Sequence, residues 1–181
     1  MDCSDEKRIR EFKEKIGYDD PVTKQDLINA LESSMRDRAL YAWFIWKALE
    51  RKMTKEEAES VMTEALHDYG LYKSKGLGTV TNALEGMLNQ SSRNGMFVFE
   101  QEFKALSEDY AEKHIRNCPL VNAFHEVGAS EEECRTLCTR ILAASDFAML
   151  EPFSDSVELS FPKTLSTDDV CIMCVRKKER K

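Results

Sequence analysis

The sequence has no long apolar run. Its longest uninterrupted one, residues 39–46, has eight residues, far fewer than the ~20 that an α-helix needs to cross a bilayer. The first six residues, Met-Asp-Cys-Ser-Asp-Glu, are too polar for a secretory signal peptide. The sequence therefore predicts a cytoplasmic protein with no membrane segment.

Positive charge is also scarce, because 26 Lys and Arg stand against 33 Asp and Glu, for a net charge of −7. Binding to a phosphate backbone needs a basic face, so no nucleic-acid partner is predicted. The charge is uneven, since five basic residues and one acidic residue in 176–181 leave −11 for residues 1–175. We interpret the basic end as a solvated tail.

The chain has no internal repeat and no low-complexity segment. Its 181 residues, 42% of them hydrophobic, suffice to bury a core without disulfides or a structural metal. We expect a single domain with a helical part (1–95), an α+β part (96–176) and a basic tail (177–181). In a cytoplasmic protein the six cysteines should be thiols.

Helical patterns dominate the first half. Thr23 is a predicted N-cap of a helix running to about Lys52, whose second half is apolar nearly all round and should be the buried central helix. A capping box at Thr54 starts the next helix, and Gly70 is its expected stop. Residues 77–88 form a weaker helix.

Two segments that follow are ambiguous. Residues 96–106 are either a strand that leads into a helix or helix throughout, and residues 110–117 have no clean period of either kind. Pro119 then begins a short helix that Gly128 closes, and a capping box at Ser130 starts another.

The C-terminal part has β patterns. Residues 157–161 alternate apolar and polar side chains, and residues 170–176 return as a second strand. Because an isolated hairpin is only marginally stable, these strands should join a larger antiparallel sheet packed on the helices. The predicted class is α+β.

The cysteine spacings suggest different roles. Cys171 and Cys174 lie three apart in a predicted strand, so they should point to opposite faces and cannot share a metal unless the strand breaks. Cys134 and Cys138 share an otherwise apolar helix face, which favours plain core.

Cys118 precedes Pro119 and should be the N-cap of the helix that follows. The free N–H groups and positive dipole end of a helix can lower a thiol pKa and create a nucleophile. The alternative, a small and partly buried residue at a helix start, is equally compatible with the pattern.

His114 is the histidine of most interest. If residues 110–117 form a strand, His114, Arg116 and Cys118 point to one face; if they form a helix, Arg116 turns away. Asp146 lies at the edge of an apolar helical stripe, where a solvated surface residue is the alternative to a functional one.

Short motifs follow one another through the second half in a fixed order, namely Arg116-Asn-Cys118-Pro-Leu-Val-Asn-Ala-Phe-His-Glu-Val-Gly128, Leu137-Cys138, Ala144-Ser-Asp146, Glu151-Pro-Phe153, the strand 157–161, Lys163-Thr164 and Asp168-Asp-Val-Cys171. In this order the motifs resemble the L-2-amino-thiazoline-4-carboxylic acid hydrolase family over roughly residues 97–176. Asn117 separates Arg116 from Cys118, whereas the family commonly has the two adjacent.

The resemblance implies hydrolysis of a cyclic isothiourea that carries a carboxylate, by C–N or C–S cleavage, to a carbamoyl-cysteine-like product. Cys118 would be the nucleophile, with Asp146 or His114 as general base or acid. Arg116 would bind the substrate carboxylate. Thr164 and Cys171 match family positions and would line the pocket.

Three alternatives remain at this point. A metal-activated water could be held by some of Cys118, His114, Asp146 and Cys171, although no cofactor is predicted and no metal is identified. A non-catalytic small-molecule-binding or sensor domain of the same fold is the second. The third is a homodimer built on the aromatic-rich residues 39–46.

Overall fold

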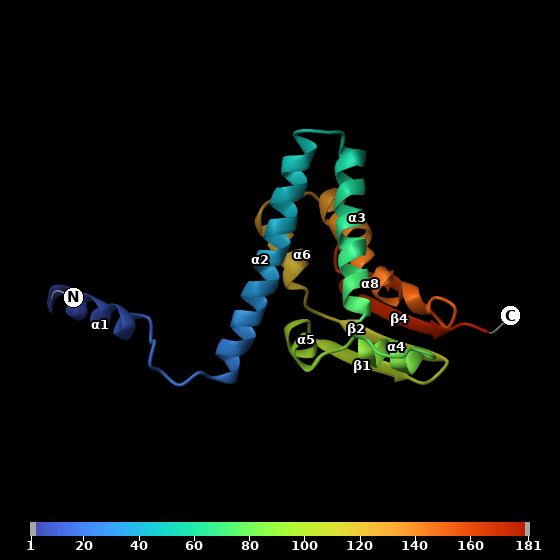
Figure 1. Cartoon of the computed structure of the whole chain (residues 1–181), viewed down its shortest axis with the longest axis horizontal. Helices are drawn as coiled ribbons and strands as arrows, with labels where there is room; N and C mark the ends of the chain where they lie inside the picture. The colour runs from blue at the N-terminus through green and yellow to red at the C-terminus, as the bar shows by residue number, and fades with distance from the viewer. Residues whose placement is uncertain (1–2, 180–181) are drawn as a thin grey trace.

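A computed structural model of the chain describes residues 3–179 and contains one four-stranded antiparallel sheet (Figure 1). Its order is β1-β2-β4-β3, so the predicted C-terminal hairpin does join a larger sheet. The ambiguous segment 110–117 provides a strand. The predicted α+β class is confirmed. The strands are β1 (Gln101–Leu106), β2 (Tyr110–Ile115), β3 (Val157–Lys163) and β4 (Cys171–Lys177).

Two long helices, α2 (Lys24–Glu50) and α3 (Lys55–Ser74), form an antiparallel pair, and α1 (Cys3–Lys15) lies apart from the rest of the chain (Figure 1). Both predicted N-caps, Thr23 and Thr54, are present as capping boxes. However, α2 is not buried all round. It buries Trp43 and Trp46 but exposes Tyr41, Phe44 and Ile45.

Gly70 does not stop α3, which continues to Ser74. A Cβ at Gly70 would lie 2.7 Å from the Cβ of Ala148 and would also collide with the backbone of Ser145. Both residues belong to α8 (Ala143–Leu150). This glycine therefore permits close packing of two helices, and the prediction of a helix end there was wrong.

The chain between α3 and the sheet also differs from expectation. Helix α4 (Ala83–Asn89) starts later than predicted, and α5 (Arg93–Val98) precedes β1. Residues 96–106 thus form the end of a helix that leads into a strand. Neither alternative, a strand that leads into a helix or helix throughout, was correct. Ser92 caps α5, and Glu100 takes a positive φ of 46° that turns the chain into β1.

The segment after β2 begins as predicted, with α6 (Pro119–Glu126) followed by Gly128 at φ 77° and α7 (Glu131–Thr136) capped by Ser130. It then becomes a π-helix, η1 (Leu137–Leu142), before α8 and the short η2 (Glu151–Phe153).

The two cysteines of this segment, Cys134 and Cys138, have different surroundings. Cys134 is fully buried among helices, whereas Cys138 lines a cavity. The prediction of plain core holds for Cys134 only.

The buried side chains form two clusters. One joins α2, α3, α6 and η1 around Trp46, Phe124 and Leu137; the other joins α4, α8 and the sheet around Met87 and Val175. Each such side chain contributes about 1.5–3 kcal/mol on burial. Within the described residues, no helix is both long and apolar enough to cross a bilayer.

Candidate functional site

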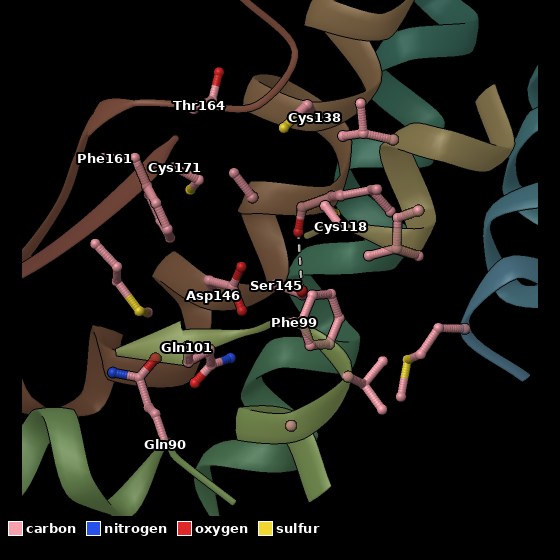
Figure 2. Close-up of a pocket in the computed structure, with 18 of the residues that line it drawn as sticks. Gln90, Phe99, Gln101, Cys118, Cys138, Ser145, Asp146, Phe161, Thr164 and Cys171 are labelled. Carbon is pink, nitrogen blue, oxygen red and sulfur yellow. Dashed lines mark hydrogen bonds between the residues drawn. The ribbon is translucent and has the colours of Figure 1, made fainter. Parts of the chain in front are cut away.

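A cavity of about 610 Å³ is lined by side chains from the long helices, the sheet and the segments between them (Figure 2). Most of its wall is apolar. That volume lies within the range of ligand pockets, and an apolar wall with a few polar groups is their usual composition. Apolar contributors include Leu31, Met35, Phe99, Leu120, Phe161 and Met173.

Four of the six predicted site residues line this cavity, namely Cys118, Asp146, Thr164 and Cys171. They come from the N-cap of α6, from α8, from the loop after β3 and from the start of β4. Figure 2 shows them around one space together with Cys138.

His114 and Arg116 lie outside the cavity. His114 Nε2 lies 2.8 Å from Glu112 Oε1 on the opposite face of β2, and the exposed Arg116 pairs with Glu102 at 3.3 Å. The strand ends at Ile115, so its two-residue alternation does not extend to Cys118. The predicted shared face of His114, Arg116 and Cys118 is not formed.

Cys118 is the N-cap of α6, as expected, and the backbone N–H groups of Val121 and Leu120 act to lower the pKa of its thiol. Burial outweighs them and raises that pKa to about 11. Of the two alternatives for this thiol, the raised pKa favours a partly buried residue at a helix start over an activated nucleophile, and Cys118 is protonated at neutral pH.

The other two cavity cysteines are protonated as well. Burial raises the pKa of Cys171 to about 12, and burial also raises the pKa of Cys138 despite hydrogen bonds from Ser166 and Thr164. The three thiols are free. At neutral pH they behave as small, weakly polar parts of the wall.

Two further ionisable groups of the cavity wall are Asp146 and a residue that sequence reasoning missed, Lys113. Burial raises the pKa of Asp146, against the nearby positive charges of Lys73, Lys113 and Arg38. Figure 2 shows its carboxylate pointing into the cavity. Asp146 is thus not the solvated surface residue that was the alternative.

Lys113 lies on the inner face of β2 with only 3% of its surface exposed. Burial lowers its pKa, and the charges of Asp146 and Cys171 oppose that shift. Its Nζ donates a hydrogen bond to Ser91 Oγ at 3.2 Å. A lysine between inward-facing Ala111 and Ile115 was a usable signal, but only once this segment was known to be a strand.

Two glutamines of the wall were also missed. Within the described residues, the Oε1 atoms of Gln90 and Gln101 are buried and accept no hydrogen bond. A buried acceptor without a donor costs about 1–3 kcal/mol, so such atoms are uncommon and call for a partner. No sequence pattern marks them, because the missing donor is a property of the packing.

Among the side chains that the structure describes, no three His, Cys, Asp or Glu converge closely enough to hold a metal ion. Of the four residues proposed as ligands, His114 lies outside the cavity.

Comparison with known proteins places the chain in a family. A family model described as L-2-amino-thiazoline-4-carboxylic acid hydrolase matches residues 33–175. The chain belongs to this family. The match to the hydrolase family includes most of α2 and all of α3, which carry no motif recognised in the sequence, and so extends the resemblance seen over residues 97–176.

No curated protein matches the chain. Among solved structures, the chain is similar to a trafficking protein particle complex subunit 3 from Naegleria fowleri covalently bound to palmitic acid, with 13% identity and a TM-score of 0.54. The alignment covers 81% of this chain and 96% of the other. At this identity the likeness shows that this hydrolase-family member shares the fold.

Proposed function

We propose that the chain hydrolyses a small cyclic thio-amidine of the L-2-amino-thiazoline-4-carboxylate type inside the cavity. The observation that carries the proposal is convergence. Cys118, Asp146, Thr164 and Cys171 belong to four separate pieces of the family pattern, and all four line one cavity. The family description supports hydrolysis as the reaction class.

Asp146 is the proposed general base and acid. Burial raises the pKa of its carboxyl toward neutral pH, and a group whose pKa lies near the working pH can both accept and return a proton. Asp146 would take a proton from water as the water oxygen bonds to the carbon between sulfur and nitrogen. It would return that proton to the sulfur or nitrogen whose bond to this carbon breaks.

Cys118 remains a candidate nucleophile only with help. Because its thiol pKa is about 11, another group must remove the proton before sulfur can attack. Asp146 is the carboxylate that faces it across the cavity (Figure 2). Asp146 is therefore required whether water or sulfur attacks the substrate.

The test is release of carbamoyl-cysteine from L-2-amino-thiazoline-4-carboxylate by the purified chain, followed by mass spectrometry. Asp146→Asn should lower the rate by about 10²–10⁴, the usual contribution of general acid–base catalysis. The exposed Asp155 provides the matched control, and Asp155→Asn should leave the rate unchanged. Absence of turnover by the unmodified chain would refute the hydrolase proposal.

A second candidate function is non-catalytic binding of a long apolar ligand. Three free thiols in a mainly apolar wall favour it, as does the palmitic acid bound covalently in a protein of similar fold. In this case a cavity thiol would attack the carbonyl of an acyl thioester, and the carrier would leave as its own thiol. Intact-mass measurement after incubation with palmitoyl-coenzyme A would detect the adduct, and Cys118→Ala would show whether Cys118 carries it.

A further inference from the structure

We propose that the natural ligand of this cavity is a zwitterion with an apolar arm, its carboxylate bound by Lys113 and its N–H-bearing cation by Asp146, Gln90 and Gln101. The inference rests on the proposed function, which places a thio-amidine in this cavity. It adds which residues recognise the two charged ends and that the substrate is larger than the bare thiazoline.

The carboxylate end is assigned to Lys113 because it is the buried cation of the wall. Arg38 and Lys73 also contribute to the lining, but both are exposed. Within the described residues Lys113 forms no ion pair, and its one hydrogen bond goes to the neutral Ser91 hydroxyl. An ammonium has three donors, so two remain for a ligand carboxylate.

The opposite end is assigned to acceptors. Gln90 Nε2 donates to the Gly86 carbonyl at 2.9 Å, which leaves its Oε1 as the acceptor without a donor. Gln101 contributes a second such oxygen, and Asp146 adds a carboxylate. Three acceptors around one space match a head group with several N–H donors, such as an amidinium, better than a single hydroxyl.

The charges of the pair support the same assignment. Burial lowers the pKa of Lys113 and raises that of Asp146, so both groups are biased toward their neutral forms. A ligand that brings one negative and one positive end would favour the charged form of each.

Size indicates the apolar arm. At about 30 Å³ per non-hydrogen atom, the share of a water molecule in the liquid, the roughly nine such atoms of L-2-amino-thiazoline-4-carboxylate would fill about 270 Å³. The cavity holds about 610 Å³, and apolar side chains such as Leu31, Phe99 and Phe161 form much of its wall. An apolar substituent on the ligand would occupy that remaining space.

Calorimetric titration of the full chain tests both parts. The probes are L-2-amino-thiazoline-4-carboxylate, its methyl ester, and two extended acids with a benzyl group on the exocyclic nitrogen or on the ring carbon beside sulfur. We expect the acid to bind at least about tenfold more tightly than the ester. At least one extended acid should bind about tenfold more tightly than the bare acid.

Lys113→Met should remove the preference for acid over ester, whereas the matched control Lys104→Met, an exposed lysine on β1, should keep it. Equal binding of acid and ester by the unmodified chain would overturn the recognition of the carboxylate. If neither extended acid binds more tightly than the bare acid, the proposal of an apolar arm is overturned. Neither comparison depends on a variant folding.

The two proposals can fail separately. Selective binding without product formation would refute hydrolysis and leave the ligand assignment standing. Product formation with equal affinity for acid and ester would refute the ligand assignment and leave hydrolysis standing.

Discussion

The two faces of β2 carry polar side chains in opposite states. On the outer face, Glu112 contacts Tyr110 and His114, and Tyr110 also contacts Cys174 at 3.3 Å. On the inner face, Lys113 has a single neutral partner, the Ser91 hydroxyl. In the same cavity wall, the buried side-chain oxygens of Gln90 and Gln101 accept no hydrogen bond within the described residues. A saturated network stabilises a fold, whereas unsatisfied buried groups point to a ligand.

The largest expected difference between the faces is in activity. Asp146→Asn should reduce turnover of the thiazoline substrate by about 10²–10⁴, while His114→Gln should change it by less than about twofold because His114 lies outside the cavity. Steady-state rates of both variants measure this. A large loss of turnover in His114→Gln, together with unchanged turnover in Asp146→Asn, would reverse the functional assignment of the two faces.

Thiol reactivity should show the next largest effect. With a pKa of about 11, Cys118 should react with iodoacetamide at pH 7 roughly 300-fold more slowly than an unperturbed thiol, whose pKa is about 8.5. Peptide mapping by mass spectrometry against free glutathione gives the rate. Fast alkylation of Cys118 at pH 7 would restore the activated nucleophile predicted from its N-cap position.

Stability should change with opposite signs on the two faces. Lys113→Met removes a buried ammonium and should raise the free energy of unfolding by about 1–3 kcal/mol. Glu112→Leu leaves Tyr110 and His114 without their acceptor and should lower it by about 1–3 kcal/mol. Urea titrations compare them, and a destabilised Lys113→Met would identify Lys113 as part of the structural framework.

The smallest effect concerns the pH dependence of stability. Asp146 has a raised pKa in the folded state, so it lowers stability as pH rises from its unfolded pKa through the folded one. Glu112 has a lowered pKa, chiefly through Tyr110 and then His114, so its contribution is lost as pH falls through the folded pKa.

Urea unfolding between pH 3 and neutrality, for Asp146→Asn and Glu112→Gln beside the unmodified chain, separates the two signs. Relative to the unmodified chain, Asp146→Asn should gain stability with rising pH and Glu112→Gln should lose it. The same sign for both variants would show that the two carboxylates have equivalent surroundings.

Local chemistry made much of the fold predictable. The capping boxes at Thr23, Thr54 and Ser130 start the helices they were expected to start, because the required contacts lie within three residues. Strand alternation likewise separated Cys171, which lines the cavity, from Cys174, which faces Glu112.

The remaining features depend on distant parts of the chain. The pKa of Cys118 follows burial by other elements, which outweighs the adjacent helix N-terminus. Lys113 could be placed only once its segment was known to be a strand, and the oxygens of Gln90 and Gln101 lack donors only because of how the elements pack. For this reason four predicted residues line the cavity, but the groups with the most distinctive surroundings were not found.

Gly70 has a consequence beyond helix packing. The backbone that a side chain at this position would strike belongs to Ser145, the residue just before Asp146. The absence of a side chain on α3 thus sets how far the acidic group of α8 extends into the cavity. Any larger residue at position 70 would widen the gap between the helices and displace Asp146, so the dimensions of the cavity depend on a residue that is absent from its wall.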